Sequence, residues 1–129
     1  MNYLLDTNVW IHLGQTPTQI PLRVRKILLN EKTLALSPIS IIEIAQKQTN
    51  GRLTLSAPLE EWISKALFDG LKLLPLTPAI ACDAYRIPDF HGDPADRIIA
   101  ATARAHHLTV VTCDRKLIAS PHVKTLSTR

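Results

Sequence analysis

Four acidic residues stand where parallel strands and the helices after them could bring their carboxylates together. Asp6 directly follows the apolar run of residues 3–5, and Asp114 follows a later run of the same kind. Glu43 lies early in one predicted helix, and Asp96 lies in the first turn of another. Converging carboxylates repel one another unless a proton or a cation neutralises them. Mg²⁺ favours oxygen ligands shared with substrate phosphate, so the pattern predicts phosphodiester hydrolysis.

Each acid also has a purely structural interpretation. An aspartate after a strand, such as Asp6 or Asp114, is often a turn residue. Asp96 could complement a helix dipole, and Glu43 could complete a capping box with Ser40. The joint placement of the four acids, and no single one of them, favours a site.

Short apolar runs alternate with helical segments along the chain. The predicted strands cover residues 3–5, 34–36, 71–76 and 108–111, with an edge strand at 122–126. The predicted helices cover residues 22–29, 39–47, 58–67 and 95–105, the last opened by Pro94 with Asp93 as its N-cap. This alternation predicts an α/β fold with a mainly parallel sheet covered by helices on both faces. Ligands of such sheets bind beyond the carboxyl ends of the strands, where the strand order reverses.

Composition predicts one domain, residues 1–129, with an overall positive charge. Of the 129 residues, 46% are hydrophobic, and 15 basic residues against 11 acidic ones give a formal charge of +4. With four acids gathered at one site, the 15 basic and seven remaining acidic residues carry +8, which would attract an anionic partner. We expect no signal peptide and no membrane span, and therefore a cytoplasmic protein. Cys82 and Cys113 are too few for a disulfide scaffold and lack zinc-site spacing, so we expect buried free thiols.

Three basic residues adjoin the acids in sequence and are candidates for contacts with phosphates. They are Arg97, Arg115 and Lys116. Arg97 could equally pair with Asp93, and the five histidines receive no catalytic role.

Four segments together resemble the PIN-domain ribonucleases, in particular the VapC-type toxins of prokaryotic toxin–antitoxin modules. The segments are YLLDTN (residues 3–8), SPISIIEIA (37–45), HGDPADRIIAATA (91–103) and VTCDRK (111–116). Each motif is weak alone, whereas four in this order and spacing are specific. The resemblance spans nearly the whole chain.

The resemblance implies a PIN-like α/β/α sandwich with an acidic pocket that binds Mg²⁺ or Mn²⁺. Its catalytic and metal-binding residues would be Asp6, Glu43, Asp96 and Asp114. Asp6 and Asp96 would be direct ligands and Asp114 could act through water, while Asn8, Asp93 and Thr112 would support them. The resemblance also implies an RNA substrate, a homodimer and inhibition by a cognate VapB-type antitoxin. The helices at residues 22–29 and 58–67 are candidate docking surfaces, although core packing also explains their apolar residues.

Two other functions remain open from the sequence. An aspartate-nucleophile phosphatase also places an Asp after the first strand, but its second Asp, two positions on, is here Asn8. A noncatalytic RNA- or protein-binding domain could use the same acids to hold a structural cation.

Overall fold

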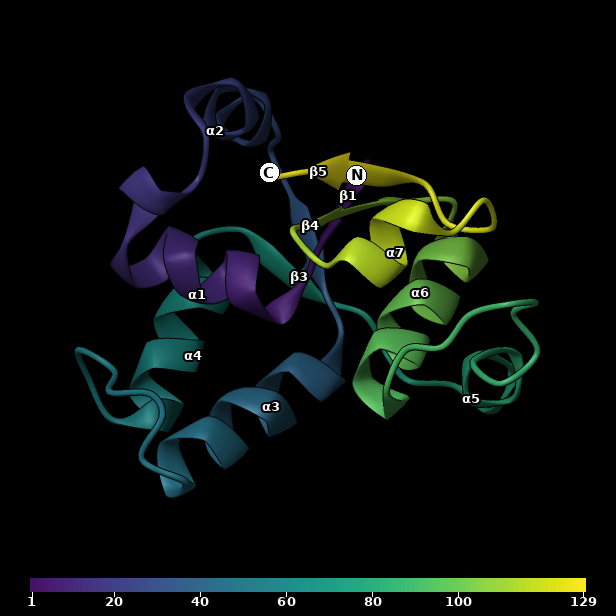
Figure 1. Ribbon diagram of the computed structural model, residues 1–129. Helices are drawn as coiled ribbons and strands as arrows, with labels where there is room; N and C mark the ends of the chain where they lie inside the picture. The colour runs from purple at the N-terminus through teal and green to yellow at the C-terminus, as the bar shows by residue number, and fades with distance from the viewer.

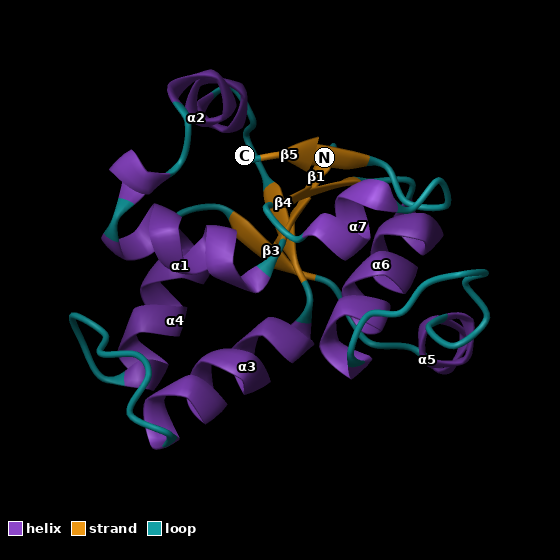
Figure 2. Cartoon of the chain, in the orientation of Figure 1, coloured by secondary structure: helices purple, strands orange, loops and turns teal.

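Five short parallel strands form the central sheet of the protein. The computed structural model describes the backbone of residues 1–129 and every side chain except that of Phe68. The strands are β1 (Tyr3–Leu5), β2 (Leu34–Leu36), β3 (Leu71–Leu73), β4 (Thr109–Thr112) and β5 (Thr125–Ser127). They are ordered β3-β2-β1-β4-β5 and all pair in parallel. Figure 2 draws the strands in orange among the purple helices. The predicted α/β class with a parallel sheet is confirmed.

Helices lie on both sides of this sheet (Figure 1). They are α1 (Thr7–Gln15), the 3-10 turn η1 (Pro17–Gln19), α2 (Leu22–Leu29), α3 (Pro38–Thr49), α4 (Leu59–Phe68), α5 (Pro78–Asp83), α6 (Pro94–His106) and α7 (Arg115–Ala119). Among the described residues, no helix has both the length and the apolar character that a membrane crossing requires.

Alternating side chains of the strands face two separate hydrophobic clusters. Leu4 and Val110 pack with buried residues of α6 and α7, including Ile99 and Leu117. The next residues along the strands, such as Leu5, pack with buried residues of α1, α2, α3 and α4. The period of two along each strand therefore fixes which helices cover which face. Within the second cluster, the rings of Trp10 and Trp62 meet edge to face, with centroids 4.9 Å apart.

Several boundaries differ from the sequence-based expectations. Helix α1 begins directly after Asp6 and was not predicted, and α5 and α7 were also missed. Helix α3 is capped by Ser37, whose hydroxyl accepts a hydrogen bond from the Ile39 amide, so the proposed capping box of Ser40 with Glu43 is wrong. Strand β3 is three residues long, and the edge strand lies at Thr125–Ser127. The cysteines are free as expected but not buried, because Cys82 is exposed and Cys113 half-buried.

The strand order reverses at β1. The chain first builds outward through β2 and β3, then crosses back through α6 to place β4 on the other side of β1. Because the connections leave β1 and β4 in opposite directions, a crevice opens beyond the carboxyl ends of these two strands. Asp6 follows β1, and Asp114 follows β4 by two residues.

Candidate active site

Asp6 is a buried carboxylate fixed on both of its oxygens. It is 7% exposed and is the N-cap of α1. Its Oδ1 accepts a hydrogen bond from the Thr7 amide at 2.8 Å, and its Oδ2 accepts one from the Thr112 hydroxyl at 2.6 Å. The Asp6 amide donates to the Val111 carbonyl at 3.0 Å. The ends of β1 and β4 thus determine where this carboxylate points.

Thr112 connects Asp6 with Asp114. Its fully buried hydroxyl donates to Asp6 and accepts from the Asp114 amide at 2.9 Å. Asp114 is in turn the N-cap of α7, because its Oδ1 accepts from the Lys116 amide at 2.7 Å and the Leu117 amide at 3.2 Å. A single hydroxyl therefore links the acids that follow the two strands.

Glu43 reaches the same place from α3. That helix begins where β2 ends, so its N-terminal half lies at the carboxyl edge of the sheet. The Thr7 hydroxyl donates to Glu43 Oε1 and also lies 2.8 Å from the hydroxyl of buried Ser40. The first turn of α1 thereby holds both Asp6, through the Thr7 amide, and Glu43.

Asp93 and Asp96 lie at the start of α6. Because α6 leads into the beginning of β4, its own first turn lies at the opposite, carboxyl edge of the sheet. Asp93 is the N-cap, and its Oδ1 accepts from the Asp96 amide at 2.9 Å. The Asp93 amide favours the ionised form of the Asp96 carboxyl, but among the described residues no basic side chain forms an ion pair with it, so the carboxylate is open to a cation.

All four predicted acids line one open cavity of about 450 Å³. The lining residues are Asp6, Thr7, Asn8, Glu43, Lys47, Asp93, Asp96, Cys113, Asp114, Arg115, Lys116 and Arg129. Thr112, predicted as a supporting residue, lies beneath this surface through its bond to Asp6. The structure thus brings the four acids together at the carboxyl edge of the sheet.

Mutual repulsion and burial raise the pKa values of three of these acids. Burial is the main cause for Asp6, whose pKa is also raised by the charge of Asp114. Burial likewise raises the pKa of Glu43, and the charges of Asp6 and Asp93 add to the effect. For Asp96, burial and then the charges of Asp93, Asp114 and Asp6 raise the pKa to about 7. The cluster is therefore short of positive charge.

The donor set fits a hard divalent cation. It consists of carboxylate oxygens without a histidine, which suits Mg²⁺ or Mn²⁺ better than zinc. Among the described side chains, no group of three His, Cys, Asp or Glu residues is arranged closely enough to hold a metal ion. Mg²⁺ does not require such a group, because it keeps several waters and is held directly by one or two carboxylates.

Lys47 and Arg129 are the basic residues of the cavity that the sequence reasoning missed. Lys47 Nζ donates to Asn8 Oδ1 at 2.7 Å, and its charge lowers the pKa values of Asp6 and Glu43. Lys47 lies four residues after Glu43 in a predicted helix, and this spacing places two side chains on the same helix face, so the sequence could have identified Lys47. Arg129 had no such signal, since its position depends on the pairing of β5 with β4.

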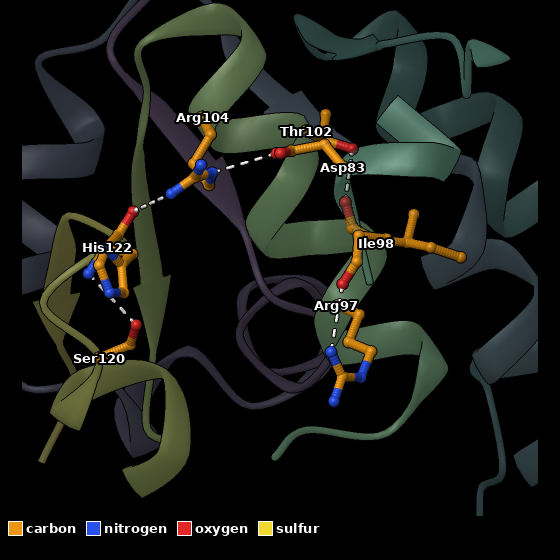
Figure 3. Close-up of polar contacts among 8 residues, drawn as sticks. Asp83, Arg97, Ile98, Thr102, Arg104, Ser120 and His122 are labelled. Atoms are coloured by element: carbon orange, nitrogen blue, oxygen red, sulfur yellow. Dashed lines mark hydrogen bonds and ion pairs between the residues drawn. The ribbon is translucent and has the colours of Figure 1, made fainter. Parts of the chain in front are cut away.

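Arg97, in contrast, does not line the cavity. Its Nε, Nη1 and Nη2 donate to the carbonyls of Gly92, Ala84 and Phe90 at 3.1, 3.3 and 2.6 Å. Its guanidinium also lies 4.7 Å from the centre of the Tyr85 ring. Figure 3 shows Arg97 on α6, whose next turns carry Arg104 in its ion pair with Asp83. Arg97 fixes the loop that leads to Asp93, and it does not pair with that aspartate.

Replacing Arg97 by alanine is therefore expected to destabilise the fold rather than to weaken a contact with phosphate. Loss of its hydrogen bonds leaves three loop carbonyls without their donor, which corresponds to about 2–4 kcal/mol. Urea unfolding followed by circular dichroism measures this. The matched control is Arg115→Ala, an exposed side chain of the cavity rim that should change the free energy of unfolding by less than about 0.5 kcal/mol. An Arg97→Ala variant as stable as the parent would contradict this role.

The sequence and the fold both match known proteins. The family model described as PIN domain matches residues 3–121. The chain belongs to the PIN-domain family. It is 32% identical over 120 residues to Ribonuclease VapC22 of Mycobacterium tuberculosis. The aligned residues cover 92% of this chain and 92% of that protein.

Solved structures of other proteins share this fold. The DNA-bound VapBC of Salmonella typhimurium superposes with a TM-score of 0.74 at 20% identity, covering 100% of this chain and 99% of that one. FitAcB of Neisseria gonorrhoeae gives a TM-score of 0.67 at 25% identity, covering 98% and 97%. The α/β/α sandwich expected from the four motifs is confirmed.

Proposed function

We propose that the protein is a metal-dependent endoribonuclease of the VapC type that hydrolyses RNA phosphodiester bonds. The observation that carries this proposal is the convergence of Asp6, Glu43, Asp96 and Asp114 on one cavity at the crevice between β1 and β4. Membership in the PIN-domain family and the similarity to Ribonuclease VapC22 support the choice of RNA as substrate.

Asp6 and Asp96 are the proposed direct ligands of Mg²⁺, with Mn²⁺ as a substitute. Asp6 is positioned by two hydrogen bonds, and Asp96 lines the cavity without a basic partner, so one ligand is rigid and the other is open to a cation. Glu43 and Asp114 complete the acidic pocket, Asp114 acting through water. When bound, the ion supplies an activated water and stabilises the charge that develops on the scissile phosphate.

The remaining residues of the pocket hold these acids in place or meet the RNA. Thr112 and Asp93 orient Asp6 and the first turn of α6 by hydrogen bonds. Asn8 accepts a hydrogen bond from the Lys47 ammonium, which keeps a positive charge beside Asp6 and Glu43. Arg115 and Lys116 are exposed on the rim and could attract flanking phosphates.

As a cellular role, we propose the toxin of a toxin–antitoxin pair, acting on cytoplasmic RNA. Similar structures include a toxin–antitoxin complex from Klebsiella pneumoniae, with a TM-score of 0.73 at 19% identity. We propose a VapB-type antitoxin as partner, and a homodimer as the assembled state. Of the two candidate docking helices, α2 leaves Leu22 56% and Leu29 83% exposed. On α4, Trp62 is buried, so core packing accounts for that side chain.

The test is turnover of RNA by the purified protein. We expect a labelled single-stranded RNA to be cleaved internally with Mg²⁺ or Mn²⁺, and to remain intact when EDTA removes the metal. Cleavage that persists in EDTA would contradict the metal requirement. RNA binding without turnover under any divalent ion would instead favour the noncatalytic alternative, in which the acids hold a structural cation.

A further inference from the structure

Arg129 is held at the edge of the acidic cavity by contacts on two sides. Its backbone amide donates to the Ser127 hydroxyl at 3.1 Å, and its carbonyl oxygen accepts from Arg23 Nη2 at 2.8 Å. On the side chain, Nε donates to the Cys113 carbonyl at 2.7 Å. Cys113 directly precedes Asp114, so the guanidinium is anchored next to one of the four site acids.

The other edge of the guanidinium is unoccupied by protein groups. Among the described residues, Arg129 Nη1 and Nη2 donate no hydrogen bond, and the side chain forms no ion pair with a carboxylate. With Nε engaged, the two Nη groups form the remaining donor fork, whose geometry matches two oxygens of a phosphate.

Arg129 differs in this respect from its basic neighbours on the rim. The side chains of Arg115 and Lys116 make no hydrogen bond among the described residues, so binding a phosphate would require ordering them. Arg129 is already ordered by Cys113 and, through its backbone, by Arg23. Lys47 stands on α3 and is already bonded to Asn8, so it serves a different part of the cavity.

We propose that Arg129 binds an RNA phosphate next to the scissile one, and that Arg23 is the residue that positions it. This proposal rests on the ribonuclease function proposed above. The RNA strand would then leave the acidic cavity past the end of β5. The phosphate on one side of the cleaved bond would bind to Nη1 and Nη2 of Arg129. Arg129 thereby supplies positive charge where the four carboxylates would otherwise repel the substrate.

The first experiment measures cleavage of a labelled single-stranded RNA in Mg²⁺ and binding of the same RNA in EDTA, by fluorescence anisotropy over a range of KCl. For Arg129→Ala, we expect the KM to rise about tenfold with kcat within about twofold, because one charge-assisted phosphate contact is lost. The slope of log affinity against log salt should fall by about 0.7, the value for one phosphate on a single strand.

Three variants separate a phosphate contact from a structural effect. Arg129→Lys should keep the salt slope but recover only part of the KM, because a lysine lacks the fork. Lys124→Ala removes an exposed positive charge at the opposite end of β5 and should leave KM and the salt slope unchanged. Arg23→Ala should raise the KM less than Arg129→Ala does, and the double variant should equal Arg129→Ala alone if Arg23 acts only through Arg129.

Two outcomes have distinct meanings. If the parent cleaves RNA and Arg129→Ala matches it in KM and in salt slope, the role of Arg129 is wrong while the ribonuclease function stands. If the parent cleaves no RNA with any divalent ion, the ribonuclease function fails, and the cleavage role of Arg129 fails with it.

Discussion

Replacing Asp96 by asparagine is expected to abolish RNA cleavage and, in metal-free buffer near pH 8, to make the protein more stable. The asparagine has the same shape but cannot serve as an anionic metal ligand, so cleavage should fall by at least about 100-fold. The same change removes a charge that burial and three neighbouring acids disfavour. Because Asp96 is only half-buried and partly screened by solvent, we expect a gain of about 1 kcal/mol, or roughly 3 °C in Tm.

The two effects are measured on the same samples, by RNA cleavage in Mg²⁺ and by thermal unfolding in EDTA. Glu60→Gln is the matched control, since it removes the same charge at an exposed position of α4. It should cleave RNA as the parent does and show no rise in Tm. An Asp96→Asn variant with parental cleavage would refute the proposed mechanism, whereas one with a lower metal-free Tm would refute the repulsion among the acids.

The metal-free protein is expected to lose stability as the pH rises from about 4 to about 7. Asp6, Glu43 and Asp96 all have a raised pKa in the folded state, and that of Asp96 is raised from 3.8 to about 7. In this window the folded protein therefore holds more protons than the unfolded chain. Their contribution to stability is complete below the unfolded pKa and is lost as the pH passes the folded pKa. Each group changes the free energy of unfolding by at most about 1.4 kcal/mol per pH unit.

Mg²⁺ should reverse this trend, because it binds the ionised carboxylates and not the protonated ones. We expect the Tm to fall with pH in EDTA, and to fall less or rise with pH in excess Mg²⁺. RNA cleavage at limiting Mg²⁺ should decline below about pH 7 for the same reason. Asp96→Asn should flatten the profile measured in EDTA. Identical pH profiles with and without Mg²⁺ would show that no ion binds this cluster.

The sequence predicts those helices and strands in which the spacing of apolar residues and the residues that mark the ends indicate the same element. Helix α6 illustrates this, because Asp93 and Pro94 mark its start and buried alanines line one side of it. The sequence does not predict helix α1, because Asp6 marks the end of an apolar strand while its carboxylate is also the cap of the next helix. Helix α7 has only five residues, too few to show a helical period. Strand β5 was predicted several residues too early, since an edge strand without a buried residue has little pattern to mark it.

The acids of the candidate site could be predicted because strand ends and helix starts determine their positions. Its basic residues could not be predicted in this way, because sequence neighbours of an acid can point elsewhere. Arg97 follows Asp96 directly, yet its guanidinium binds three loop carbonyls. Arg129 lies 15 residues beyond Asp114 and still lines the same cavity, because parallel pairing returns β5 to the end of β4.

Three of the acids at this edge, Asp6, Asp93 and Asp114, are also the residues that start α1, α6 and α7. An alanine at any of them removes a negative charge and a helix cap together, and a lost cap costs about 1 kcal/mol. Asparagine caps a helix nearly as well as aspartate does. Most random mutations that abolish the proposed activity at these positions will therefore reduce the amount of folded protein as well. Aspartate-to-asparagine changes are the few substitutions at these positions that would give an inactive protein that still folds.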